Sequence, residues 1–348
     1  MSGGSDVDYE LRPAKGVDRK IFLDLLSRYQ RWVPLDGAVY ISMGGYPMSD
    51  HRMIYRRFGL EHLISIDGEE HVVDRQRFNK PTDKTKCLHL RSDKLIENFD
   101  DILKENEIPD SATRVVWMDF TEPNKLSDQL SQFEQLLETL GEGDIVRITL
   151  NANETSLKMA KPDGSKPKPI EVAAMDRGEQ RLARFRRLQN DLGSYLPSST
   201  TQDDLSNDML PILLGKLLER AAGSAFPSGS SQHAFFPLSS LVYRDGQQMI
   251  TVTGAIIDRH HFDQVEVIMA LENWPFSVEK ISDFRRLNVS TLTLKERLLM
   301  ERLVLADEEV DIVERLGFNK FGSTNAKAYF EDFKKFSRFY PNHAVVEY

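Results

Sequence analysis

Between residues 38 and 150 the sequence alternates short runs of strand type with longer stretches of helical type. Four strand-type runs are apolar and rich in β-branched residues, at 38–43, 63–67, 114–119 and 144–150, and a weaker one covers 86–90. Apolar residues at helical spacing occupy 50–58, 92–106 and 126–140. Strands that alternate with helices in this way form parallel pairs joined by crossover helices. The alternation therefore predicts an α/β fold whose ligands lie at the carboxyl ends of the strands.

The remaining segments add helices and one hairpin to this sheet. A helix is expected over 18–32, and after the sheet come a Lys/Pro-rich loop over 158–168 and helices over 171–192 and 207–222. Two β-type runs, 235–243 and 248–257, flank Asp245-Gly246, which is a strong hairpin signal. We therefore divide the chain into a helical lead-in over 1–37, a core over 38–157, a loop and helical insertion over 158–231, a terminal β-hairpin of the same sheet over 232–261 and a helical C-terminal extension over 262–348.

Composition limits the class of protein. No run of about 18 apolar residues exists, so no membrane-spanning helix and no membrane partner are expected. The polar N-terminus lacks the pattern of a secretory signal. Cys87 is the single cysteine, which excludes an internal disulfide and a Cys-based zinc site. A cytoplasmic location is the simplest expectation. The net charge of −9 disfavours general nucleic-acid binding without excluding a local basic patch.

Gly44 and Gly45 directly follow the first strand, where glycine permits a tight turn and the close approach of a ligand. An ordinary strand-to-helix turn would carry the same pair, because the full Gly-x-Gly-x-x-Gly fingerprint is absent. Asp67 ends the second strand 22 positions after Gly45 (67 − 45). In Rossmann-like domains an acidic residue about 20 positions beyond the glycines holds the ribose hydroxyls of the cofactor. The core is therefore expected to be Rossmann-like and cofactor-binding, with Asp93 either near the adenine end or at a helix cap.

Asp119 and Glu122 stand at the end of the fourth strand, in the run Met118-Asp119-Phe120-Thr121-Glu122-Pro123. The first and fourth strands of an open parallel sheet flank the crevice where strand order reverses. Pro123 is expected to keep the chain from entering a helix at once. We therefore expect Asp119 and Glu122 to orient a substrate or take its proton, with Pro123 and Asn151 beside it. Structural caps are the alternative for the two carboxylates.

Two other clusters are expected to be structural. Asp258, His260 and His261 lie close together, but three such residues without a second ligand pair are more typical of a solvated turn, so no metal is expected. Five arginines between 177 and 187 make that helix basic. A solvated face is the expectation, and contact with nucleic acid or another acidic partner is the alternative.

The order of these motifs resembles the class I SAM-dependent methyltransferases (SAM, S-adenosylmethionine). Within that class the chain is similar to a bacterial family of O-methyltransferases, related in layout to the three-Cys-motif partner proteins, and Asn288-Val289 and Phe339-Tyr340-Pro341 look like that family's tail. The resemblance implies a mostly parallel sheet with a final antiparallel pair. It also implies that Gly44, Gly45 and Asp67 hold SAM and that Asp119 sits beside the reacting centre. Ser42, which takes the place of an acidic residue common in that class, joins the expected cofactor contacts.

Two functions of different classes follow. The first is a SAM-dependent methyltransferase that acts on an oxygen or nitrogen of a small-molecule or macromolecular acceptor, mostly by positioning. The second is a catalytically silent Rossmann-like module that senses a cofactor or binds a protein partner, suggested by the incomplete glycine motif and the long helical additions. An NAD-dependent oxidoreductase fits less well, because it would need the missing fingerprint and would leave the terminal hairpin unexplained.

Overall fold

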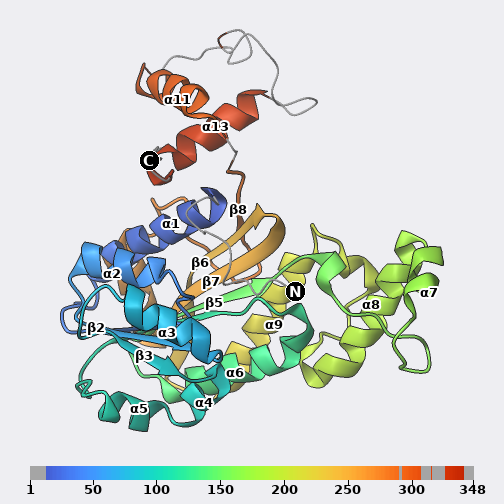
Figure 1. The fold of residues 1–348 in the computed structure, drawn as a ribbon, viewed down its shortest axis with the longest axis horizontal. Coiled ribbons are helices and arrows are strands. Elements are labelled where there is room, and N and C mark those ends of the chain that lie inside the picture. The colour runs from blue at the N-terminus through green and yellow to red at the C-terminus, as the bar shows by residue number, and fades with distance from the viewer. Residues whose placement is uncertain (1–12, 290–291, 307–314, 316–325, 341–348) are drawn as a thin grey trace.

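The computed structural model describes residues 13–289, 292–306, 315 and 326–340. In this part of the chain one eight-stranded sheet has the order β3-β2-β1-β4-β5-β7-β6-β8 (Figure 1). Strands β1 to β5 pair in parallel, and β7 is antiparallel to both β5 and β6. The mostly parallel sheet with a final antiparallel hairpin is thereby confirmed. The strands are β1 (Val39–Ser42), β2 (His62–Asp67), β3 (Lys86–His89), β4 (Arg114–Asp119), β5 (Ile145–Asn151), β6 (His233–Asp245), β7 (Gln247–Asp258) and β8 (Arg285–Leu287).

The hairpin is longer than the sequence predicts. Its pairs run from His233 opposite Asp258 to Asp245 opposite Gln247, so Gly246 alone forms the apex, at φ 91°. Glycine is needed there because this φ is costly for a residue with a side chain. The register shifts between Pro237 and Ser239, where proline cannot donate to the ladder. The short edge strand β8, parallel to β6, was not predicted.

Helices cover both faces of the sheet, with α1 above it and α6 and α9 below it in Figure 1. One core lies under α4, α5, α6 and α9, and the other lies under α1, α2 and α10 and includes side chains of α11 and α13. Helices α7 and α8 project to one side, and α11 and α13 stand beyond α1. The helices are α1 (Pro13–Tyr29), α2 (Ser49–Phe58), α3 (Glu70–Asn79), α4 (Ser92–Glu97), α5 (Phe99–Glu105), α6 (Leu126–Thr139), α7 (Pro169–Ala174), α8 (Arg177–Leu192), α9 (Leu210–Ala225), α10 (Phe262–Met269), α11 (Leu294–Ala306) and α13 (Ala326–Phe336).

Two helices that the sequence predicts as continuous are each divided. The 92–106 helix breaks at Asn98, whose side-chain amide donates to the carbonyl of Lys94 and so competes with the helical ladder. The 171–192 helix restarts at Asp176, which forms a reciprocal capping box with Glu179. Helix α3 was not predicted at all. Within the described ranges, no helix has the length and apolar character to cross a membrane.

A buried ion pair joins α1 to the centre of the sheet. Arg147, in the middle of β5, places a guanidinium nitrogen 2.6 Å from a carboxylate oxygen of Asp18, and both side chains are fully buried. Arg147 also donates to the Thr253 hydroxyl at 2.7 Å. Its guanidinium carbon lies 4.5 Å from the ring centroids of both Phe22 and Trp117. These contacts offset the desolvation of the arginine only while α1 is in place.

We expect Asp18→Ala to lower the free energy of unfolding by about 3–5 kcal/mol, because it leaves the Arg147 charge buried and unpaired. The double variant Asp18→Leu/Arg147→Met should recover most of this loss, since no charge then remains to be desolvated. Urea unfolding followed by circular dichroism measures both values. Equal destabilisation of the single and double variants would contradict this role for the pair.

Candidate functional site

A cavity of about 350 Å³ opens at the carboxyl ends of β2, β3 and β4. Asp67, Asp119 and Glu122, which the sequence identifies at the ends of two separate strands, all line it. Carboxylates outnumber cations among its described lining residues, five to two. The lining residues are Met43, Ile66, Asp67, Gly68, Glu69, Leu90, Arg91, Ser92, Asp119, Phe120, Thr121, Glu122, Lys125, Asp128, Gln129 and Gln132.

Six other predicted contacts lie outside this lining. Asp93 accepts a hydrogen bond from Nε of Arg91 at 3.1 Å, and Asn151 accepts one from the backbone N–H of Asn153 at 3.0 Å. Both side chains therefore stabilise their own turns. The residues outside the lining are Ser42, Gly44, Gly45, Asp93, Pro123 and Asn151.

The glycine turn after β1 is shaped by the protein's own packing. A Cβ atom on Gly44 would lie 2.7 Å from the ring of His51 and 2.9 Å from the hydroxyl of Ser65. Gly45 has φ 55°, in the left-handed region. The sequence suggested that a ligand approaches Gly44 closely, whereas the structure places a buried histidine there.

A buried polar group fixes this turn to the sheet. The carboxylate of Asp50 accepts hydrogen bonds from the hydroxyls of Tyr40, at 2.8 Å, and Ser42. His51 directs Nδ1 at Asp50, 3.3 Å away, and Nε2 at the carbonyl of Ile64, 3.0 Å away. Burial raises the pKa of Asp50, but the charges of His51 and Arg19 and the hydrogen bonds from His51 and Ser42 together outweigh burial and lower the pKa below the ordinary range. The Ser42 hydroxyl is thus engaged within the protein.

Asp67 is the last residue of β2, and a backbone N–H group binds one of its carboxylate oxygens. The backbone N–H of Glu69 donates to Oδ1 of Asp67 at 2.9 Å. Burial raises the pKa of Asp67 above its ordinary value, and the nearby charge of Glu69 adds to that rise, while the hydrogen bond opposes it. Oδ2 remains to accept a hydrogen bond from a ligand.

Asp119 is paired with a residue that sequence reasoning missed. Nζ of Lys15, on α1, lies 3.1 Å from Oδ2 of Asp119. Oδ1 of Asp119 is buried and has no hydrogen-bond partner among the described residues. The first turn of α1 is itself held by Asp245 of the hairpin turn, which accepts the backbone N–H groups of Ala14 at 3.3 Å and Lys15 at 2.7 Å. No sequence pattern connects positions 15, 119 and 245.

Glu122 and Pro123 differ from the sequence expectation. Glu122 is exposed and pairs with Lys125 at 2.8 Å. The expectation that Pro123 keeps the chain out of a helix is wrong, because a 3₁₀ turn begins at Pro123 itself, spans Pro123–Lys125 and runs directly into α6. Proline is tolerated at a first helical position, where its missing N–H would have no partner anyway.

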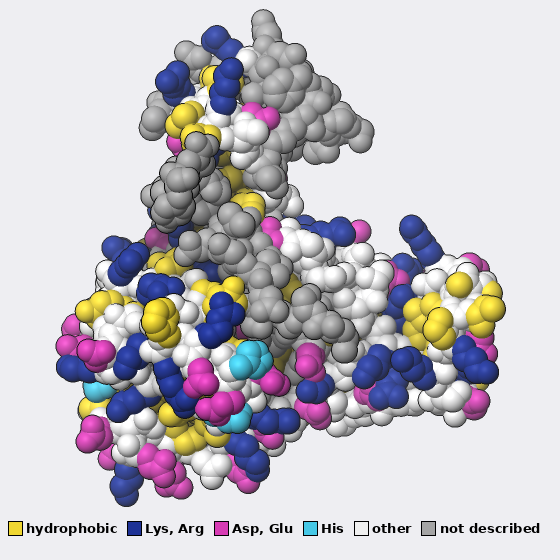
Figure 2. Space-filling model, viewed as in Figure 1, with side chains coloured by type: hydrophobic (Ala, Val, Ile, Leu, Met, Phe, Trp, Pro, Cys, Tyr) yellow, Lys and Arg dark blue, Asp and Glu magenta, His cyan; other side chains and the backbone are white. Residues whose placement is uncertain are grey.

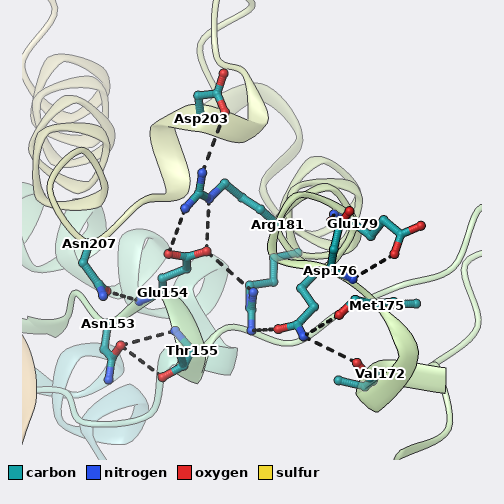
Figure 3. Close-up of polar contacts among 12 residues, drawn as sticks. Asn153, Glu154, Thr155, Val172, Met175, Asp176, Glu179, Arg181, Asp203 and Asn207 are labelled. Atoms are coloured by element: carbon teal, nitrogen blue, oxygen red, sulfur yellow. Dashed lines mark hydrogen bonds and ion pairs between the residues drawn. The ribbon is translucent and has the colours of Figure 1, made fainter. Parts of the chain in front are cut away.

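The end of β5 is clamped to the helical insertion (Figure 3). Arg181 of α8 binds the Glu154 carboxylate through two nitrogens, at 3.0 and 3.3 Å, and also lies 3.8 Å from Asp203. Arg184 reaches the same carboxylate at 3.7 Å and is buried. Asn207 accepts the backbone N–H of Glu154 at 2.9 Å. The expectation of a wholly solvated arginine face is therefore wrong for Arg181 and Arg184.

The histidines near 260 belong to a turn. Asp258 accepts the backbone N–H of His260 at 2.9 Å, and Nδ1 of His261 lies 3.2 Å from Glu142. In the part of the chain that the structure describes, no group of three or more His, Cys, Asp or Glu side chains is arranged to hold a metal ion.

Comparison with known proteins identifies a family. The family model described as "Putative O-methyltransferase" matches residues 7–348. Curated proteins give no match. Among solved structures, an O-methyltransferase from Bacillus cereus in complex with SAH (S-adenosylhomocysteine) has 15% identity and a TM-score of 0.34, with 73% of this chain and 84% of that chain covered.

Two further solved structures match the chain with comparable identities and TM-scores. The plantazolicin methyltransferase BamL, in complex with a triazolic desmethylPZN analog and SAH, has 11% identity and a TM-score of 0.32 over 71% of this chain and 88% of that chain. LepI in complex with SAM has 9% identity and a TM-score of 0.32 over 67% of this chain. That match covers 46% of LepI, so the chain spans less than half of that protein's length.

We expect Gly44→Ala to lower the free energy of unfolding by about 1–3 kcal/mol, because the added methyl group meets the buried His51 ring. Gly223→Ala is the matched control. It lies in α9 with nothing within 4 Å of the added atom, so it should stabilise the protein by about 0.5–1 kcal/mol. Urea unfolding measures both, and stabilisation by Gly44→Ala would show that the turn is not packed as described.

Proposed function

This chain belongs to the O-methyltransferase family of the matching model, and we propose from that membership that it transfers a methyl group from SAM to an acceptor oxygen. The observation that carries the proposal is the acid-rich cavity shared by Asp67 and Asp119 at the carboxyl ends of the strands. SAM bears a positively charged sulfur, which such a cavity attracts. The diphosphate of NAD is negative and would be repelled by the same carboxylates.

The lining residues fit SAM in chemistry as well as charge. Asp67 would accept hydrogen bonds from the ribose hydroxyls, and Ile66 and Leu90 offer an apolar wall for the adenine ring. When bound, SAM supplies a methyl group on a sulfonium sulfur, and the acceptor oxygen takes the methyl group while the sulfur keeps the bonding electrons. Asp119 also lines the cavity, and its partly exposed side chain offers a carboxylate to an acceptor hydroxyl.

The chain's own contribution is positioning and proton transfer. Lys15 holds the Asp119 carboxylate in place through Oδ2, and that carboxylate would orient an acceptor hydroxyl or take its proton. Glu122 lies on the exposed rim of the same cavity, where it can assist or pass the proton to solvent. Most of the rate enhancement would come from holding acceptor and donor together.

The second candidate is a catalytically silent module that binds SAM or a protein partner. It is favoured by the ion pair between Lys15 and Asp119, since an acid engaged in anchoring α1 need not act in catalysis. Methyl transfer from labelled SAM to protein, nucleic acid or small molecules of a bacterial extract separates the two candidates. SAM binding without any transfer would favour the silent module.

We expect Asp67→Asn to weaken SAM binding by about 1.5–3 kcal/mol, because a charged hydrogen-bond acceptor is lost. Asp74→Asn, on the exposed face of α3, is the matched control and should leave the affinity unchanged. Isothermal titration calorimetry measures both. The wild-type affinity should also fall on acidification, beginning above the pH at which an ordinary aspartate titrates, because burial raises the pKa of Asp67 and protonation removes the acceptor. Equal binding by wild type and Asp67→Asn at every pH would exclude this role.

We expect Asp119→Asn to lower turnover by about 10²-fold while SAM affinity stays nearly intact, because the contact is to the acceptor. Lys15→Met separates catalysis from anchoring. If Asp119 acts chemically, Lys15→Met should retain more activity than Asp119→Asn. Single-turnover methyl transfer and calorimetry on the same preparations provide the comparison. Equal loss in the two variants would assign Asp119 to the anchoring of α1 alone.

A further inference from the structure

A second cavity, of about 380 Å³, lies beside the first. The two share Lys125 and Asp128, so they flank the start of α6. Pro123 forms part of the second cavity's wall after β4, and Leu157 and Lys158 form part of it after β5. The second cavity is therefore also built at the carboxyl ends of central strands, where α/β proteins bind their ligands.

The outer wall of this cavity comes from the insertion helix α8, through Arg187, Leu188, Asn190 and Asp191. The wall is held in place by the contact of Glu154 with Arg181 and Arg184, which fixes α8 against the end of β5 (Figure 3). Arg187 is in turn oriented by Asp191, 2.7 Å away. The cavity is thus a preformed feature of the fold, with both walls anchored to the sheet.

The charge of the second cavity differs from that of the first. Among its described lining residues, three cations, Lys125, Lys158 and Arg187, face two carboxylates, whereas carboxylates prevail in the first cavity. Figure 2 shows Lys and Arg side chains gathered over α8. The described lining residues include no aromatic side chain, and most are polar. Such a lining suits a hydrated, charged molecule better than an aromatic one.

We propose that the second cavity binds a negatively charged group of the methyl acceptor, a small hydrophilic molecule whose hydroxyl reaches Asp119 in the first cavity. The inference rests on the proposed function. The methyl donor and the acceptor hydroxyl would lie together in the acid-rich cavity, and the anionic group of the acceptor would extend past the start of α6 into the second cavity. Lys158 contributes the exposed charge that recognises the anion. Arg187, which Asp191 orients through an ion pair, adds a second contact.

Binding is tested first on full-length protein saturated with SAH, so that no turnover occurs. Citrate serves as the anionic probe and glucose as the neutral one, both by calorimetry. We expect citrate to bind more tightly than glucose and Lys158→Gln to weaken citrate about threefold to fivefold. Lys161→Gln is the matched control, because Lys161 lies in the same loop but pairs with Glu171 at 2.8 Å, outside the cavity. Equal binding of citrate and glucose, or equal behaviour of the two lysine variants, would overturn the inference.

Acceptor chemistry is tested second. Small molecules from a bacterial extract, freed of protein and nucleic acid, are divided by anion exchange into anionic and remaining fractions before incubation with methyl-labelled SAM. We expect the label to enter the anionic fraction, with a lower rate in Lys158→Gln than in Lys161→Gln. Transfer to the other fraction, or SAM binding with transfer to neither, overturns the acceptor assignment and leaves SAM binding intact. Failure of the wild type to bind SAM by calorimetry would instead overturn the proposed function.

Discussion

The ion pair between Asp18 and Arg147 is the contact on which the arrangement of the site depends. Arg147 carries a charge in the middle of a central strand, and removing such a charge from water is unfavourable unless a partner and further contacts replace the water. Asp18, the Thr253 hydroxyl and the rings of Phe22 and Trp117 together do so. Because Asp18 and Phe22 both belong to α1, the helix has one favourable position over the sheet. That position places Lys15, nearly one turn before Asp18, beside Asp119.

The hairpin completes the placement of α1 from the other end of the sequence. Asp245 accepts the backbone N–H groups of Ala14 and Lys15 in the first described turn of α1. A carboxylate there also interacts favourably with the positive end of the helix dipole. The hairpin therefore extends the sheet and also aligns a helix that begins more than 200 residues earlier. Asp119 pairs with Lys15 in the same turn of α1, so the position of its carboxylate depends on how α1 packs on the sheet.

Charge is divided between the two cavities at the strand ends. The first cavity collects carboxylates because strands β2 and β4 both end in aspartate and the loops that follow add Glu69 and Glu122. The second gains its cations from the loop after β5 and from α8 of the insertion. A Rossmann-like core without this insertion would lack the wall that α8 forms in the second cavity. The contact of Glu154 with Arg181 and Arg184 thus fixes an added helix as one wall of the second cavity.

Local sequence patterns are sufficient for the class of fold and for part of the site. Strand and helix periodicities, together with Asp245-Gly246, predict a parallel sheet that ends in a hairpin, because these patterns act between neighbours in sequence. They also place Asp67, Asp119 and Glu122 at one edge, since parallel strands end on the same side. Only the tertiary structure decided the partners: Lys15 for Asp119, His51 at Gly44, and Glu154 for two of the five helix arginines. Those contacts join segments that are distant in sequence or depend on how a turn packs, and burial determines which of them form. A charged residue in water needs no partner, whereas a buried one does, and burial is a property of the folded chain.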